Sequence, residues 1–153
     1  MSAIETPSPT EPLSLGEMPM AGDGGPRGGR VAGKSVMVVG AGSVGPGWGN
    51  GKAAAVLYAR EGAAVLCIDK AMEAAQDTAA IIAAEGGRAS AFSADVTDEA
   101  AARAAVEACI KSFSTVDIVH YNVGVSRPGG VAESTPADWR QVFAVNVDGA
   151  FLV

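Results

Sequence analysis

The segment VVGAGSVGPGWGNGKAAA, residues 38–55, decides the fold of this 153-residue chain. It grows out of an unbroken apolar run, SVMVV at 35–39, which is typical of a strand buried on both faces. Residues 52–61 then predict a helix with a glycine just after its end. The glycines from Gly40 to Gly51 let the backbone turn tightly and bring amide groups close to an anion. A strand, a glycine loop and a helix in this order predict a site for the phosphates of a nucleotide.

Strands and helices alternate along the rest of the chain. Short apolar runs predict three further strands, at 64–68, 89–93 and 116–120. Alanine-rich segments and helix caps predict helices at 71–85, after a cap at Thr97, and from a cap at Thr135 to the last residue. Connections of this length join parallel strands. We therefore expect an α/β fold, a Rossmann-type doubly wound parallel sheet with the strand order 3-2-1-4 and helices on both faces.

Two helices carry more detailed patterns. Thr135 is followed by Pro136, which suits the first helical position, and by Asp138, which completes a capping box. In the helix after Thr97, apolar residues at alternating intervals of three and one predict a single buried face. These residues are Ala102, Ala105, Val106, Cys109, Ile110 and Phe113.

Residues 1–33 differ in composition from the rest of the chain. They contain five of the eight prolines and seven of the twenty glycines, with almost no apolar periodicity. Such a segment cannot bury enough surface to offset the entropy lost on ordering. We expect a flexible tail over 1–33 and one nucleotide-binding domain over 34–153.

Composition and charge exclude several classes of partner. A net charge of −6, with no cluster of Lys and Arg, argues against nucleic acid. No stretch approaches the ~18 apolar residues of a membrane span, and a signal peptide is absent, so we expect a cytoplasmic protein with no membrane partner. Cys67 and Cys109 lie in apolar runs without CxxC or Cys/His spacing. They predict buried, reduced thiols and no metal site.

The glycine run allows more than one alignment to known phosphate loops. Both GxGxxG and GxxxGxG can be matched within it, so it predicts a nucleotide site without assigning each contact. The residues expected at the pyrophosphate are Gly40, Gly42, Ser43, Gly49, Asn50 and Gly51.

Polar residues follow three of the other predicted strands. Asp69 ends the second strand, eighteen residues after Gly51, close to the spacing of a carboxylate that binds the ribose hydroxyls of a dinucleotide. Its charge would repel a 2′-phosphate and favours NAD over NADP, although Lys70 could partly accommodate that phosphate. Asp95-Val96 and Asn122-Val123-Gly124 follow the next two strands. All should meet at the carboxyl edge of the sheet, where ligands of open parallel sheets bind.

Six segments together resemble one family. They are GKSVMVVGAG, GNGKAAAVLYAREGA, CID, ADVTD, DIVHYNVG and VFAVNVDGAFLV, spread over residues 33–153. In this combination the chain resembles the short-chain dehydrogenase/reductase family. The resemblance implies an NAD(P)-dependent oxidoreductase that transfers hydride between the nicotinamide and an alcohol or carbonyl substrate. It also implies a homo-oligomer for the full-length protein.

The resemblance also implies a role for each matched residue. The glycine loop would bind the pyrophosphate, Asp69 the adenosine ribose, and Asp95 with Val96 the adenine ring. Asn122, Val123 and Gly124 would line the site beside the nicotinamide ribose. Asn146 matches the helix asparagine that helps a water molecule carry protons to the catalytic lysine.

Several positions depart from the family pattern. Val39 replaces the usual threonine before the first glycine, and the loop has about five extra residues between Ser43 and Gly49. Tyr121 stands where the family often has its first asparagine. The family's serine and Tyr-x-x-x-Lys pair would come after Val153, and neither tyrosine of the chain is followed by lysine four residues on. We therefore expect the 153-residue chain alone to be inactive. Because its fourth strand and last helix would be uncovered, we also expect it to aggregate or to need a partner.

Two alternatives remain open from the sequence. One is a non-catalytic dinucleotide-binding module. The other is an S-adenosylmethionine-dependent methyltransferase, whose fold begins with a similar strand, glycine loop and acidic residue. The NVG and VNVDGAF segments, which have no role in a methyltransferase, favour the dehydrogenase.

Overall fold

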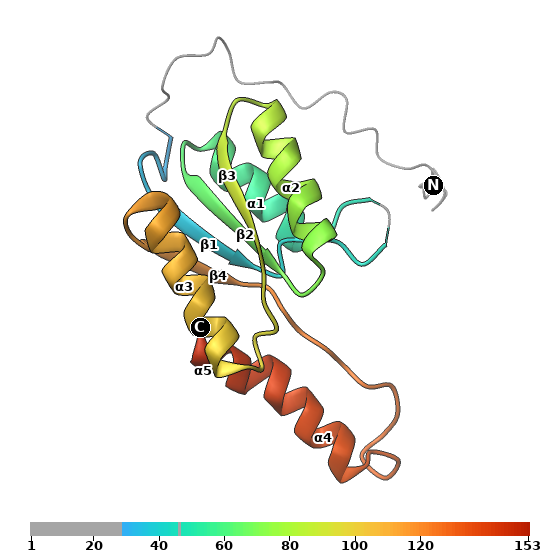
Figure 1. Cartoon of the computed structure of the whole chain (residues 1–153). Helices are drawn as coiled ribbons and strands as arrows, with labels where there is room; N and C mark the ends of the chain where they lie inside the picture. The colour runs from blue at the N-terminus through green and yellow to red at the C-terminus, as the bar shows by residue number, and fades with distance from the viewer. Residues whose placement is uncertain (1–28, 46) are drawn as a thin grey trace, which may run out of the picture.

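A computed structural model describes residues 29–45 and 47–153 of the chain. Four strands form one sheet in the order β3-β2-β1-β4, with helices on both of its faces (Figure 1). The strands are β1 (Ser35–Val39), β2 (Ala64–Asp69), β3 (Arg88–Ser93) and β4 (Ile118–Tyr121). Each neighbouring pair is parallel. The predicted fold class and strand order are confirmed.

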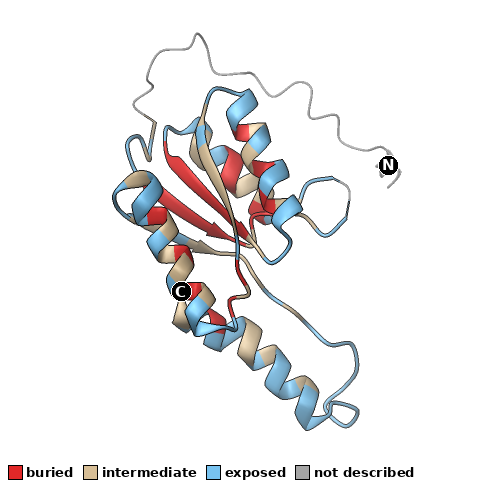
Figure 2. Ribbon diagram, viewed as in Figure 1, coloured by how far each residue is buried: buried red, intermediate tan, exposed pale blue. Residues whose placement is uncertain are grey.

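The central strand β1 divides the core into two clusters. Val36 and Val38 point to the face covered by α1 (Asn50–Arg60) and α2 (Met72–Ala84). Met37 and Val39 point to the opposite face, covered by α3 (Glu99–Phe113). Successive side chains of a strand alternate between faces, so a strand covered on both sides must be apolar throughout. All five residues of β1 are buried, as Figure 2 shows for the centre of the sheet.

The last helical stretch differs from the single regular helix expected. It begins as α4 (Pro136–Phe143), continues as a π-helical segment η2 (Ala144–Asp148), and ends as α5 (Gly149–Leu152). Its start is as predicted, because Thr135 and Asp138 form the capping box and the proline occupies the first turn. In Figure 1 this stretch extends away from the sheet. The π-helical turn was not predicted.

The helix α3 corrects two predictions. Its N-cap is Asp98 and not Thr97, because the Asp98 carboxylate accepts the amide of Ala100 at 2.8 Å. The Thr97 hydroxyl instead donates to Asp95 Oδ1 at 2.7 Å. Ile110, expected in the core, is 48% exposed. The buried residues of α3 are the small ones, Ala102, Ala105 and Cys109, so the buried face is narrower than the apolar pattern.

Residues 1–28, most of the predicted tail, lie outside the described residues. The last part of that segment is ordered: the amide of Ala32 donates to Gly29 O at 3.0 Å, and Val31 packs against the core. The described residues thus start five positions before the predicted boundary at residue 34, and the tail over residues 1–28 stays a prediction. Cys67 and Cys109 are both buried and free, and burial raises the pKa of Cys67 to about 12. No helix in the described part of the chain is long and apolar enough to cross a membrane.

The edge strand β4 and the last helices leave apolar surface uncovered. Val119 on β4 is 45% exposed and Phe151 on α5 is 87% exposed. We expect the 153-residue chain to self-associate, because an unprotected strand edge and a large apolar surface favour contacts between copies. Size-exclusion chromatography should show species larger than a monomer, and the double variant V119K/F151K should shift the profile toward the monomer. A wild-type chain that elutes as a monomer at all concentrations would contradict this expectation.

Candidate functional site

Two parts of the glycine loop, Gly42-Ser43 and Gly49, lie against each other. A methyl group built onto Gly49 would lie 3.3 Å from the carbonyl oxygen of Gly42 and 3.6 Å from Cα of Ser43. Ser43 and Gly49 therefore lie next to each other, although five residues separate them in the sequence. Read across this junction, the loop is Gly40-Ala41-Gly42-Ser43-Gly49-Asn50-Gly51, a GxxxGxG spacing. The contact selects one of the alignments that the sequence left open.

The loop packs so closely on the start of α1 that no side chain fits at Gly51. A methyl group there would lie 1.8 Å from the carbonyl oxygen of Gly40. Gly40 itself has a φ of +79°, a conformation that favours glycine. The amides of Gly40 and Ala41 both donate to the carbonyl of Ile68, at 2.8 and 2.9 Å. The loop is thus fixed between β2 and the first turn of α1.

The N-terminus of α1 has neither a capping side chain nor an acidic residue that would disfavour a bound anion. Its N-cap, Gly49, has no side chain, and its first turn contains no acidic residue. The first helical hydrogen bond runs from the amide of Ala53 to Gly49 O, at 3.0 Å. The amides of the preceding residues have no acceptor within the helix. They and the helix dipole favour negative charge at this position.

Asp69 connects the end of β2 to the glycine loop. Its Oδ2 accepts the amide of Gly42 at 3.0 Å, and its Oδ1 accepts the amide of Ala71 at 3.1 Å. A side chain on Gly42 would collide with this carboxylate, since the methyl carbon would lie 2.6 Å from Oδ2. The sequence predicted Asp69 and the loop at one site, and the structure brings them into direct contact.

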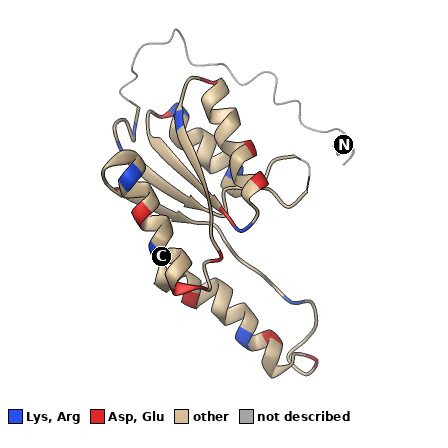
Figure 3. Ribbon diagram, in the orientation of Figure 1, with Lys and Arg blue, Asp and Glu red and all other residues tan. Residues whose placement is uncertain are grey.

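Lys70 and Asp95 form an ion pair across the ends of β2 and β3. The Lys70 ammonium lies 2.7 Å from Asp95 Oδ2, and the Thr97 amide and hydroxyl both donate to Oδ1. The bond from Lys70, followed by those from Thr97, lowers the pKa of Asp95 to about 2, while Asp95 raises the pKa of Lys70. In Figure 3, basic and acidic segments meet at this end of the sheet. The Lys70 ammonium group is therefore already paired with a carboxylate.

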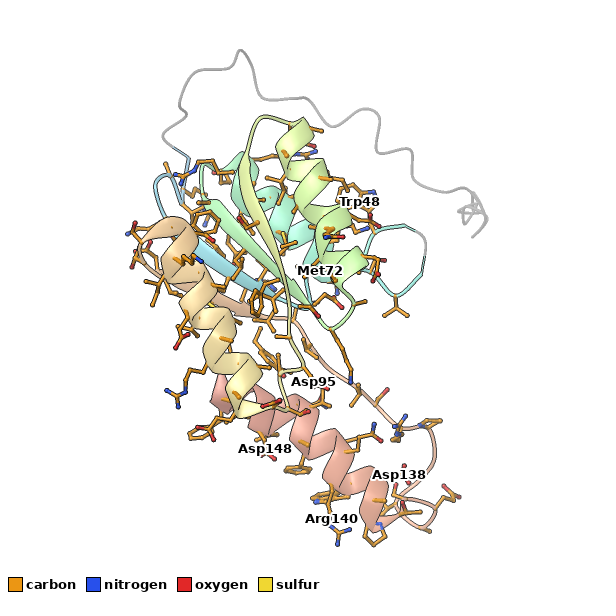
Figure 4. All side chains as sticks on the ribbon, in the orientation of Figure 1. Trp48, Met72, Asp95, Asp138, Arg140 and Asp148 are labelled. Atoms are coloured by element: carbon orange, nitrogen blue, oxygen red, sulfur yellow. The ribbon has the colours of Figure 1, made fainter. Side chains whose placement is uncertain are left out.

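The residues after β4 complete the carboxyl edge. The Asn122 amide donates to the carbonyl of Gly40 at 3.3 Å, and Val123 lies against the same glycine. Val96, after β3, is 6% exposed. Figure 4 shows Asp95 near the loop that leads into α3, whereas Asp138 and Arg140 lie toward the far end of α4. The predicted residues of the loop and of all three strand ends thus share one edge.

Asn146 approaches this edge from the π-helical segment. Its side-chain oxygen accepts the amide of Val125 and its nitrogen donates to the carbonyl of Val125, both at 2.8 Å. Gly124 lies beside it, with room for a methyl group 3.5 Å from Asn146 Oδ1. Both ends of the Asn146 amide are therefore used to position the backbone that follows β4.

Two residues of this edge were not predicted as functional. Thr78, fully buried on α2, donates its hydroxyl to the carbonyl of Ala41 in the glycine loop at 2.8 Å. A polar residue on the buried face of an alanine-rich helix was the available signal. The Tyr121 hydroxyl donates to the carbonyl of Val145 in η2. The sequence marked Tyr121 only as a departure from the family pattern. The other tyrosine, Tyr58, lies 3.2 Å from His120 Nδ1 and takes no part in the edge.

Comparison with known proteins identifies the family. A family model described as short chain dehydrogenase matches residues 34–153. D-threitol dehydrogenase of Mycolicibacterium smegmatis is 35% identical over 124 residues, which cover 81% of this chain and 46% of that protein. The solved hydroxysteroid dehydrogenase of Escherichia coli aligns with a TM-score of 0.74 and 32% identity, over 80% of this chain and 50% of its own.

A second solved structure is a 7α-hydroxysteroid dehydrogenase complexed with NADH and 7-oxo glycochenodeoxycholic acid. It aligns with a TM-score of 0.74 and 32% identity, over 80% of this chain and 46% of its own. The chain spans about half the length of the curated relatives it matches. Fold, motifs and relatives agree, and the chain belongs to the short-chain dehydrogenase family.

Proposed function

We propose that the chain is the cofactor-binding part of an NAD-dependent oxidoreductase that transfers hydride between the nicotinamide and an alcohol or carbonyl substrate. The observation that carries this proposal is the closed glycine loop, which recovers the GxxxGxG spacing and leads into an uncapped helix N-terminus. Family membership supports it and removes the methyltransferase alternative. A matched solved structure is a complex with NADH, which supports a nicotinamide cofactor.

The pyrophosphate is proposed to bind at the start of α1. The backbone of Gly40, Gly42 and Ser43 would approach it from the loop, and Gly49, Asn50 and Gly51 would approach it from the first turn of the helix. The absence of side chains at the glycines and of acids in the first turn supports a close approach by a doubly charged group.

Two features favour NAD over NADP. The carboxylate of Asp69 suits the adenosine ribose hydroxyls and would repel a 2′-phosphate. Lys70, the neighbouring cation that could accommodate such a phosphate, is paired with Asp95 at 2.7 Å. A 2′-phosphate would have to compete for this ammonium group against a carboxylate already in contact with it. Asp95 and Val96 are proposed to border the adenine ring.

The nicotinamide end is assigned to the loop after β4. Asn122, Val123 and Gly124 would line it, and the proton-relay role of Asn146 remains a prediction from the family resemblance. Bound NAD supplies the hydride acceptor. Residues 1–153 contain no tyrosine followed by lysine four positions later. We therefore propose that these residues bind and orient the cofactor and do not support turnover by themselves.

The substrate and partner proposals rest on the relatives. D-threitol dehydrogenase and meso-2,3-butanediol dehydrogenase are named for small alcohols, which supports an alcohol or carbonyl substrate. A homo-oligomer is proposed for the full-length protein. The free, buried state of both cysteines supports a reducing cytoplasm.

Titration of the 153-residue chain with NADH tests the proposed function. We expect saturable enhancement of nicotinamide fluorescence, competition by ADP-ribose, and no competition by S-adenosylmethionine. The same titration with NADPH should give weaker binding. Absence of NADH binding by folded chain, or displacement of NADH by S-adenosylmethionine, would contradict the proposal.

A further inference from the structure

Tyr121 is the last residue of β4 and reaches across to the π-helical segment. It pairs with Val39 at the end of the central strand, and its side chain is half-buried. Its hydroxyl donates to the carbonyl oxygen of Val145 at 2.5 Å. A strand end and a helix far apart in the sequence are thus joined by one side chain.

The π-helical turn moves the usual helical donor away from the carbonyl of Val145. In a regular α-helix the amide of Gly149 would donate to Val145, four residues back. Here the amide of Gly149 donates to Ala144 O instead, five residues back. The Tyr121 hydroxyl donates to the carbonyl of the half-buried Val145 in place of that amide, and loss of such a hydrogen bond is destabilising.

Gly149 gives the phenol access to this carbonyl. A methyl group on Gly149 would lie 2.5 Å from the Tyr121 hydroxyl oxygen and 3.0 Å from Val96 Cγ2. Gly149 is also the one buried residue of the whole stretch 136–152. The contact of these helices with the strand end is therefore concentrated where Tyr121 and Gly149 meet.

The next residue along η2 makes the second connection to the same segment. Asn146 binds both the amide and the carbonyl of Val125, four residues after Tyr121. Consecutive residues of the helix, Val145 and Asn146, thus bind the strand end and the loop that continues from it. Because Val145 and Asn146 are adjacent on the helix, a contact that holds Val145 also restricts where the Asn146 side chain can lie.

We propose that Tyr121 is a positioning residue: its hydroxyl fixes the π-helical turn at Val145, and so places Asn146 on the backbone that lines the nicotinamide end. The inference rests on the proposed function for its consequence and on the contacts of Val145, Gly149 and Val125 for its geometry. Burial and the nearby charge of Asp95 raise the pKa of Tyr121, so the hydroxyl keeps the proton that it donates.

The variant Tyr121→Phe tests the role with little change of shape, and Tyr58→Phe is a matched control. Tyr58 is also half-buried, and its hydroxyl also contacts β4, through His120 at 3.2 Å, but it has no link to η2. Loss of the Tyr121 hydroxyl should speed amide hydrogen exchange at Val125 and Gly149 about tenfold, with the β1 and β2 amides unchanged. Tyr58→Phe should leave Val125 and Gly149 unchanged.

Affinities for NADH and ADP-ribose distinguish a local effect of Tyr121→Phe at the nicotinamide end from a general loss of stability, because ADP-ribose lacks the nicotinamide. In Tyr121→Phe the affinity for ADP-ribose should stay within about twofold, while NADH should lose roughly fivefold or more. Equal losses for both ligands, or wild-type exchange at Val125 and Gly149, would overturn the proposal. If the wild type binds neither ADP-ribose nor NADH, the proposed function fails. The amide exchange rates at Val125 and Gly149 then decide the role of Tyr121 by themselves.

A second pair of variants guards against a folding defect in the first. Gly149→Ala places its methyl group against the Tyr121 hydroxyl, so it should loosen the same two amides. In the Tyr121→Phe background this collision is absent, and the added effect of Gly149→Ala should be smaller than in the wild type. Fully additive effects would show that the hydroxyl and the glycine do not form one contact.

Discussion

Replacing Gly51 with alanine is expected to abolish NADH binding and to destabilise the chain by about 3 kcal/mol or more. The new methyl group would lie 1.8 Å from the carbonyl oxygen of Gly40 and 2.8 Å from the Asn122 side-chain nitrogen. Neither the loop backbone nor the first turn of α1 can accept it without moving apart. That movement separates the amides that are proposed to bind the pyrophosphate. Thermal unfolding and fluorescence titration measure the two effects.

Gly86→Ala provides the control for this prediction. Gly86 has a φ of +79° but nothing within 4 Å of an added methyl group. The variant should lose about 1 kcal/mol through backbone strain and bind NADH like the wild type. If Gly51→Ala binds NADH normally, the close packing of loop and helix is not required for the site.

Replacing Asp69 with alanine is expected to reduce the preference for NADH over NADPH by at least about tenfold, or roughly 1.4 kcal/mol. The change removes both the acceptor for the ribose hydroxyls and the charge that repels a 2′-phosphate. NADH should bind more weakly and NADPH relatively better. Fluorescence titrations of both cofactors with wild type and variant give the ratio.

Asp69→Asn separates charge from structure in this prediction. The asparagine oxygen can still accept the amide of Gly42, which Asp69 Oδ2 accepts at 3.0 Å in the wild type. The preference for NADH over NADPH should decrease, while the glycine loop keeps its position. Equal affinities of the wild type for NADH and NADPH would remove Asp69 from its proposed role.

The sheet could be predicted from the sequence because its signals are local. The two central strands are short apolar runs, and the unbroken run at 35–39 is typical of a strand such as β1, which has neighbours on both sides. The chain order of strands and helices then leaves few parallel arrangements. The capping box at Thr135 is equally local, since both of its partners lie within one helical turn.

The features that could not be predicted depend on contacts between distant residues. The alignment of the glycine run follows from the approach of Gly49 to Gly42, which spacing alone does not reveal. The π-helical turn forms where Tyr121 reaches Val145, and helical periodicity does not record a single widened turn. Asp98 replaced Thr97 as the cap because the Thr97 hydroxyl already bonds to Asp95.

The sequence predicted which residues form the candidate site more fully than it predicted the contacts between them. From the sequence, Lys70 was a cation that could partly accommodate a 2′-phosphate, whereas the structure pairs it with Asp95 at 2.7 Å. That pair requires β2 and β3 to be neighbours in register, with Asp69 opposite Ser93. Register is a property of the assembled sheet, so the pair becomes visible only in the structure.

A crystal structure of the chain with NADH tests the central claim most directly. We expect the pyrophosphate against the amides at Gly49–Gly51, the adenosine ribose hydroxyls on the Asp69 carboxylate, and the adenine beside Asp95 and Val96. The Lys70–Asp95 pair should remain intact. A nucleotide bound elsewhere, or bound here with its ribose away from Asp69, would contradict it.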